Sequence, residues 1–201
     1  MGAQVVRRVP AVLVNTRWLD ARIGYDGSQL RAHWILAQTG LCGDALVAFR
    51  GPCAVARAEI ADLADVDGPG IAGDDMVHFV WEMFAAPDLL LAVHRQRLLA
   101  AQAGELLREL APAARLRRGG DDLWLGDGKL SISIATVTPV SSLVHFAVNA
   151  TPGGAPVRTA TLQELRVEPR AFADALLHRA AAEQESIAEA RAKVRSKGEW
   201  R

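Results

Sequence analysis

The segment that most constrains the fold is residues 121–136, DDLWLGDGKLSISIAT, because it places a turn signal between two apolar runs. The dipeptide Asp127-Gly128 separates the run Leu123–Leu125 from the run Leu130–Ile134. An Asp-Gly pair in this setting is a strong signal for a β-hairpin, since tight hairpin turns need residues that tolerate positive φ angles. The sequence therefore predicts two antiparallel strands joined at this turn.

The second of these strands is expected to have two unlike faces, because side chains alternate between the faces of a sheet. One face is apolar and should point into a core; it comprises Leu130, Ile132 and Ile134. The other face is small and polar, with a cation at its end; it comprises Lys129, Ser131, Ser133 and Ala135. A ligand that lies flat on this second face would meet the lysine. The alternative is a sheet with an ordinary solvated side, although Ser and Ala are weak strand formers.

The segment 141–150, SSLVHFAVNA, repeats this pattern after a loop in which Pro139 favours a turn. Its expected core face comprises Val144, Phe146 and Val148. Its opposite face comprises His145, Ala147 and Asn149. If the two strands pair, their small faces merge into one shallow floor, which we predict to be a substrate-binding surface.

Residues 121–149 resemble a stretch of the biotin and lipoate protein ligases. Those ligases carry an Asn-Asp pair, a strand, a hairpin, a Gly-Lys or Lys-Lys step, a second strand and a later run that ends in Asn-Val. The corresponding residues here are Asp121-Asp122, Leu123–Leu125, Gly128-Lys129, Leu130–Ile134 and Ala147–Asn149. In the ligases the lysine contacts the carboxylate and the phosphate of an acyl-adenylate, and the resemblance implies that role for Lys129.

The chain departs from the ligase pattern at two places. Asp121 stands where the ligases have Asn, and their long Gly-Arg-rich loop is reduced to Phe49–Cys53. The resemblance implies ATP as a cofactor if the chemistry is ligase-like, and the short loop leaves open whether the ATP-binding half is kept.

A second resemblance covers nearly the whole chain. The stretches that carry it are DGSQLRAHWILAQTGLCGDALVAFRGPC, MVHFVWEMF, RQRLL, KLSISIATVTPVSSLVHFAVN and ARAKVR. They are similar to the prokaryotic domain-of-unknown-function family 366. That resemblance implies a fold like the biotin/lipoate ligases and the class II aminoacyl-tRNA synthetases.

The bulk composition fits one globular domain, which we place at residues 1–196, with a frayed tail at 197–201. Acidic and basic residues number 23 each, a balance that argues against a nucleic-acid partner. No apolar run reaches the ~20 residues that span a bilayer. The N-terminus lacks the apolar stretch of a signal peptide, so we expect a cytoplasmic protein.

The remaining periodicities complete an α+β fold, with a mixed, mostly antiparallel sheet and helices packed on one face. The expected strands are 4–14, 44–49, 59–66, 121–125, 129–136 and 143–150. The expected helices are 28–38, 76–84, 87–110 and 170–195. A Gly- and Asp-rich loop is expected at 65–75, and the short connections after residue 121 predict antiparallel pairing.

Several further groups have two interpretations each. Arg50 follows an apolar strand and precedes a turn, which suits a second anion contact, but it also suits an ion pair across the sheet. Cys53 would need an activating neighbour to act as a nucleophile, and none is adjacent in the sequence. The run His94–Arg97 fits a solvated face or ion pairs, or a phosphate contact. His78 and Glu82 could share a metal, but two ligands do not make a site, and we predict no metal centre.

These observations favour an acyl- or adenylyl-transferring enzyme of the biotin/lipoate-ligase-like class, acting on a small anionic ligand. Lys129 would be catalytic by neutralising a carboxylate or phosphate. Its substrate-binding residues would be Arg50, Ser131, Ser133, Ala135, His145, Ala147 and Asn149. The alternative is a non-catalytic small-molecule or nucleotide-binding protein that kept the fold. A homodimer through a sheet edge is a third hypothesis.

Overall fold

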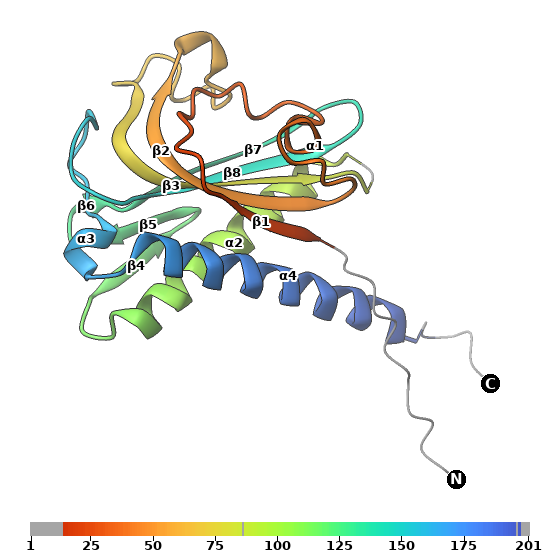
Figure 1. The fold of residues 1–201 in the computed structure, drawn as a ribbon. Helices are drawn as coiled ribbons and strands as arrows, with labels where there is room; N and C mark the ends of the chain where they lie inside the picture. The colour runs from red at the N-terminus through yellow and green to blue at the C-terminus, as the bar shows by residue number, and fades with distance from the viewer. Residues whose placement is uncertain (1–13, 86, 196, 198–201) are drawn as a thin grey trace.

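The computed structural model describes residues 14–85, 87–195 and 197. The predicted strand 4–14 falls almost wholly outside these residues, as does most of the predicted tail 197–201. Figure 1 shows how the elements of the described residues are arranged.

A five-stranded sheet forms the centre of the fold. Its strands, in spatial order, are β1 (Asn15–Leu19), β2 (Ala45–Val55), β3 (Ile71–Met83), β8 (Ser142–Asn149) and β7 (Ser131–Val137). β1 runs parallel to β2, and every other neighbouring pair is antiparallel. The prediction of an α+β fold with a mixed, mostly antiparallel sheet is confirmed.

A second, three-stranded sheet contains the predicted hairpin. It comprises β4 (Leu116–Gly119), β5 (Asp122–Leu125) and β6 (Gly128–Lys129). Leu125 pairs with Gly128, so the two-residue turn is Gly126-Asp127 and lies one residue earlier than predicted. Gly126 has φ 57° at the first turn position, where a type II′ turn requires glycine.

Two long helices pack on one face of the five-stranded sheet, below it in Figure 1. α2 (Leu89–Leu110) contacts β7 and β8, and α4 (Pro169–Lys193) contacts β1 and β2. Both begin at acidic caps: Asp88 accepts from the Leu91 N–H, and Glu168 accepts from the N–H groups of Arg170 and Ala171. In the part of the chain that the structure describes, no helix is long and apolar enough to cross a membrane.

The other helical elements are short. They are α1 (Trp34–Thr39), the 3₁₀ helix η1 (Arg57–Glu59) and α3 (Leu162–Leu165). The predicted helix 28–38 is thus confined to its second half. The predicted strand 59–66 is wrong, since that segment forms part of η1 and a run of turns.

The predicted helix Met76–Phe84 is also wrong, because this segment forms most of β3, the central strand. β3 lies between β2 and β8 and is buried on both faces from Asp75 to Met83. A strand covered on both sides has no apolar–polar alternation, so its sequence cannot be told from a short buried helix by periodicity.

The face prediction for β7 is wrong as well. Ser131, Ser133 and Ala135 pair with Val148, Phe146 and Val144, the residues of β8 that face the helices and the main core. Ile132 and Ile134 pair with Ala147 and His145, and they point to the opposite face. The predicted floor of Ser131, Ser133 and Ala135 therefore faces α2.

The cause of the inversion is Leu130, which belongs to neither β6 nor β7. The chain leaves the small sheet and enters the large one at this residue, and both Leu130 and Ser131 are buried on the helix side. Because two consecutive side chains lie on the same side, the alternation of side chains along the strand shifts by one residue. Every later side chain of β7 therefore lies on the face opposite to the predicted one.

The two serines on the helix side of β7 differ in hydrogen bonding. Oγ of Ser131 accepts from the Leu123 N–H at 2.8 Å. Oγ of Ser133 is buried without a hydrogen-bond partner among the described residues. A buried polar group that is paired stabilises the fold, and one that is unpaired costs free energy.

We therefore expect opposite results from one chemical change at these positions. Ser131→Ala should lower the free energy of unfolding by about 1–3 kcal/mol, because it leaves the Leu123 N–H buried without a partner. Ser133→Ala should be neutral or stabilising by up to about 1 kcal/mol, because it removes an unpaired hydroxyl. Urea denaturation measures both. Equal losses for the two variants would contradict this assignment of faces.

Candidate functional site

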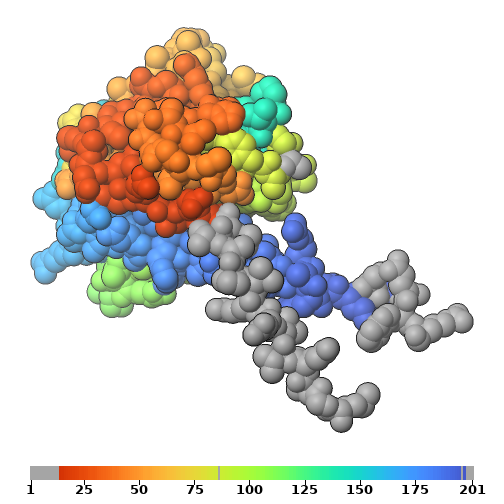
Figure 2. Space-filling model, turned by 45° about the vertical axis from the view of Figure 1, so that its right-hand side comes forward, coloured from red at the N-terminus to blue at the C-terminus, as the bar shows by residue number. Residues whose placement is uncertain are grey.

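A cavity of about 350 Å³ lies on the face of the large sheet opposite α2 and α4. Strands β2, β3, β7 and β8 contribute to its walls, and two loops, 59–70 and 155–159, enclose it. In Figure 2 the first of these loops, in light orange, lies at the top of the molecule, away from the blue α4. The sheet thus separates a helical layer from a ligand-sized space.

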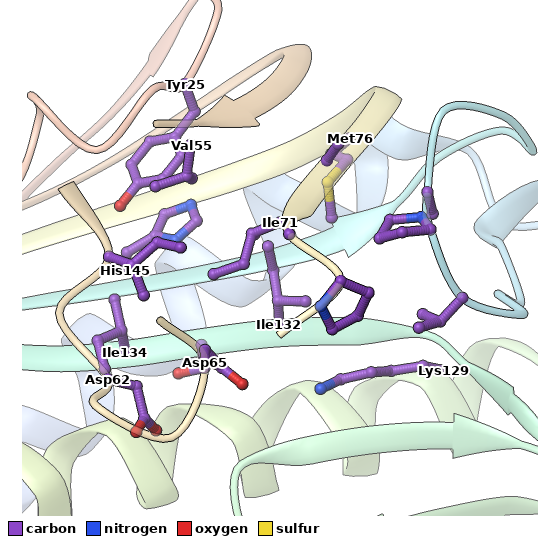
Figure 3. A pocket seen from close by; sticks show the side chains of 18 of the residues that line it. Tyr25, Val55, Asp62, Asp65, Ile71, Met76, Lys129, Ile132, Ile134 and His145 are labelled. Carbon is purple, nitrogen blue, oxygen red and sulfur yellow. The ribbon is translucent and has the colours of Figure 1, made fainter. Parts of the chain in front are cut away.

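The middle of the cavity is apolar. Figure 3 places Ile71 and Ile132 between Lys129 on one side and the pair Tyr25 and His145 on the other. Val55 and Ile134 extend the same apolar wall. A cavity with an apolar middle and polar groups at its ends is typical of small-molecule sites.

Lys129 is held in place by its backbone. Its N–H donates to the carbonyl of Arg158, and its carbonyl accepts from the Ala160 N–H, each at 3.0 Å. The side-chain amide of Asn149 donates to the same Lys129 carbonyl at 3.0 Å and to the Ala160 carbonyl at 3.2 Å. Asn149 therefore acts on Lys129 through its backbone, and it also lines the cavity.

The ammonium of Lys129 lies 3.0 Å from Oδ2 of Asp122. Burial raises the pKa of the Asp122 carboxyl, and the nearby Asp121 and Asp65 add to this, while Lys129 opposes them. In Figure 3 the Lys129 nitrogen and the Asp65 carboxylate point into the same part of the cavity. Lys129 is thus a half-buried cation with acidic neighbours.

Two histidines and two aromatic rings form the other end of the site. The Tyr25 ring stacks on the His145 ring with centroids 3.6 Å apart and planes 6° apart. Nδ1 of His78 lies 3.1 Å from Nε2 of His145, and Nε2 of His78 lies 3.2 Å from the Gly51 carbonyl. Phe49 stacks on His78, with ring centroids 5.1 Å apart.

Both imidazoles are neutral at physiological pH. Burial lowers the pKa of His78 to about 4, against the contribution of the Gly51 carbonyl, which raises it. Burial also lowers the pKa of His145 well below its ordinary value, and the neighbouring His78 adds to that effect. Neither ring is exposed enough to bear a charge at low cost.

The predicted site residues divide into two groups. Lys129, His145 and Asn149 line the cavity, and Ser133 borders it although its hydroxyl is buried on the helix side of the sheet. The remaining four, Arg50, Ser131, Ala135 and Ala147, are not among its lining residues. Ala147 does face the cavity side, but it is packed beneath other residues.

Arg50 forms an ion pair with Asp75 of the neighbouring strand, which is the second of the two roles considered for it. Its guanidinium donates through Nε and Nη2 to the carboxylate of Asp75, at distances down to 2.6 Å. Arg22 and Thr151 also donate to Asp75. Burial works to raise the pKa of Asp75, but these hydrogen bonds outweigh it and hold the pKa below its ordinary value.

The other candidate groups also have structural partners. Oε1 of Glu82 accepts from the His33 N–H and the Ser141 hydroxyl, both at 2.8 Å. Arg97 pairs with Asp121 at 3.2 Å, so the 94–97 cluster includes an ion pair. The described residues contain no group of three or more potential metal ligands.

Cys53 does not have the features of a nucleophile. It is buried, and burial raises the pKa of its thiol to about 12. The thiolate is the reactive form of cysteine, so this thiol is inert at neutral pH.

Tyr25 and Asp65 line the cavity and had no role in the sequence analysis, which considered His78 only as a metal ligand. The sequence does contain one signal: the tripeptide Val-His-Phe occurs at 77–79 and again at 144–146. Each copy places one histidine between two core residues, and the strands that carry them are antiparallel neighbours. A lone polar residue in each of two apolar strands is a reason to expect that they meet.

The sheet, its helical layer and the cavity define a fold of the biotin/lipoate-ligase class. A biotin protein ligase from Aquifex aeolicus, in complex with biotin and ATP, superposes with a TM-score of 0.55 at 14% identity, over 86% of this chain and 70% of the ligase chain. Likeness at that identity shows the fold.

Sequence and structure together then identify the family. The model of the family described as Domain of unknown function (DUF366) matches residues 14–195. An uncharacterized protein of Methanocaldococcus jannaschii is 32% identical over 153 residues, 73% of this chain and 68% of that protein. A protein of unknown function from Pyrococcus horikoshi has a TM-score of 0.86 at 40% identity, over 91% of this chain and 98% of that chain. The chain belongs to the DUF366 family, as its sequence stretches predict.

The neutral histidines predict a pH dependence of stability. Since their folded pKa values are lowered, the unfolded chain takes up protons at a higher pH than the folded chain does. The free energy of unfolding should be at its full value above pH 6.5 and should fall by roughly a few kcal/mol toward pH 4, because burial lowers the pKa of His78 from 6.5 to about 4. Asp75, whose pKa lies below the ordinary 3.8, loses its contribution only at lower pH.

Denaturation at a series of pH values measures this slope. His78→Gln should flatten it, because the variant lacks one of the two buried imidazoles. His178→Gln, at an exposed position of α4, is the matched control and should keep the wild-type slope. An unchanged slope in His78→Gln would show that other groups cause it.

Proposed function

We propose that the protein binds a small organic acid in the cavity, with Lys129 at the carboxylate and the apolar wall along the body of the ligand. The observation that carries this proposal is the direction of Lys129. Its ammonium points into a cavity with an apolar middle, and among the described residues its ion-pair partner is Asp122, at 3.0 Å. A charge-assisted contact in a partly buried site is stronger than the same contact at the surface.

The charges around the cavity favour a ligand with one negative charge over a polyphosphate. Besides Lys129, the lining includes five acidic residues: Glu59, Asp62, Asp65, Asp121 and Asp122. Glu59 pairs with Arg31, and Asp121 pairs with Arg97. Asp62 and Asp65 have no ion pair within the described ranges. Two like charges about 4 Å apart cost roughly 4 kcal/mol at the effective dielectric of a protein surface.

Arg50 is not part of this proposal. Its guanidinium donates to Asp75 through two nitrogens, and breaking that pair would leave a buried carboxylate without its partner. The proposed anion contact is therefore made by Lys129.

Acyl-adenylate formation is the second candidate, and one observation favours it. The fold is shared with a biotin protein ligase whose structure is in complex with biotin and ATP. An exchange assay tests this candidate directly. Incubation with ATP, magnesium and short-chain acids should return labelled pyrophosphate into ATP if the protein activates acids, and should return none if it only binds them.

Two variants with opposite charge changes test the binding proposal. Lys129→Met should weaken the binding of hexanoate and related short-chain acids by about ten-fold or more, because the charge-assisted contact is lost. Asp122→Asn should strengthen it by a similar factor, because the competing carboxylate is removed. Calorimetric titration gives both affinities, and the melting temperature checks that each variant is folded.

Hexanamide is the matched control ligand, since it has the same body without the charge. Its affinity should respond little to either substitution. If Lys129→Met strengthens binding and Asp122→Asn weakens it, the preferred ligand is a cation and the proposal is wrong.

A further inference from the structure

The pair His78 and His145 has a protonation pattern that its surroundings determine. Nε2 of His78 lies 3.2 Å from the carbonyl oxygen of Gly51. A carbonyl oxygen can only accept, so Nε2 of His78 must bear the proton. Because the ring is neutral, its Nδ1 bears a lone pair and acts as an acceptor.

The protonation of His145 follows from that of His78. Its Nε2 lies 3.1 Å from Nδ1 of His78, which accepts, so Nε2 of His145 must be the donor. In a neutral imidazole the other nitrogen has no proton. Nδ1 of His145 is therefore an acceptor, and no described residue donates a hydrogen bond to it.

Gly51 holds this pattern in place. A Cβ at residue 51 would lie 1.9 Å from the Ile23 carbonyl oxygen, so only glycine fits there. The pairing of β2 with β3 shifts register between Gly51 and Cys53. At this irregularity in the β2–β3 pairing, the Gly51 carbonyl lies within hydrogen-bond distance of the His78 side chain.

His145 borders the cavity although only 2% of its surface is exposed. Tyr25 covers one face of its ring, and His78 holds its Nε2 edge. The ring therefore has no freedom to turn and present its N–H to the cavity. An acceptor that lacks a protein donor at the wall of a cavity favours a ligand that brings a donor to it.

We propose that His145 Nδ1 selects acids that carry a neutral hydrogen-bond donor, an O–H or N–H, at the end remote from the carboxylate. This inference rests on the proposed binding of an acid at Lys129. Figure 3 shows the two ends on opposite sides of Ile71 and Ile132, so a ligand that contacts both needs an apolar middle. The preferred class is an ω-hydroxy acid or a similar acid with a terminal donor.

The tautomers can be tested without any ligand. Two-bond ¹H–¹⁵N correlation spectra of the wild-type protein distinguish a proton on Nε2 from one on Nδ1. His78 and His145 should both show the Nε2–H form, and assignment comes from the spectra of His78→Gln and His145→Phe. A proton on Nδ1 of His145 would overturn the inference, whatever the protein binds.

The selectivity is tested with three acids of one chain length: hexanoate, ω-hydroxyhexanoate and ω-methoxyhexanoate, together with their shorter and longer homologues. The hydroxy acid of the best length should bind about ten-fold more tightly than its methyl ether, the worth of one hydrogen bond to a buried acceptor. The ether has an acceptor where the alcohol has a donor, so it cannot bond to Nδ1.

The variant His145→Phe should lose this preference, because phenylalanine keeps the stacking on Tyr25 and has no acceptor. His178→Phe on the far side of the sheet is the control and should keep it. If His145→Phe does not fold, the inference is still tested by the tautomer spectra and by the ratio of the wild-type affinities for the hydroxy acid and its methyl ether. Lys129-dependent binding without a preference would overturn this inference alone. Absence of binding by every acid would overturn the proposed function and this inference with it.

Discussion

The architecture depends on a sheet that is covered on both faces, so that polar groups in its central strands must find partners inside the protein. β3 and β8 carry Asp75, His78, Glu82, His145 and Asn149 in buried positions. Each is hydrogen-bonded by a strand, loop or helix that is distant in sequence. Because a buried polar group without a partner costs about 1–3 kcal/mol, these contacts fix how the cavity-side segments dock onto the sheet.

A second constraint is the transfer of the chain between two sheets at Leu130. This residue lies between the small sheet and the large one, and its burial turns Lys129 toward the cavity and Ser131 toward α2. Asn149 and Ala160 then hold the Lys129 carbonyl from two sides. Backbone hydrogen bonds thus fix the main chain of Lys129, and the ion pair with Asp122 then orients its ammonium.

The cavity combines two different polar ends. Lys129 supplies a positive charge among carboxylates, and the histidine pair supplies a neutral acceptor in an aromatic stack. The distinction matters because a charge attracts an anion over some distance, whereas a buried acceptor discriminates through one directed bond. Affinity and selectivity would therefore depend on different residues of the same cavity.

The sequence by itself determined the fold class, the hairpin after residue 121 and the two long helices, because these depend on local signals, a turn and a helical period, and on a family resemblance. It predicted a role for Lys129. It also held the repeated Val-His-Phe tripeptide, whose meaning was not evident without the pairing of β3 with β8. The identity of β3 as a strand and the faces of β7 were decided only by tertiary structure. Periodicity carries no signal in a strand buried on both faces, and alternation cannot be extended through a residue such as Leu130, at which the chain changes sheets.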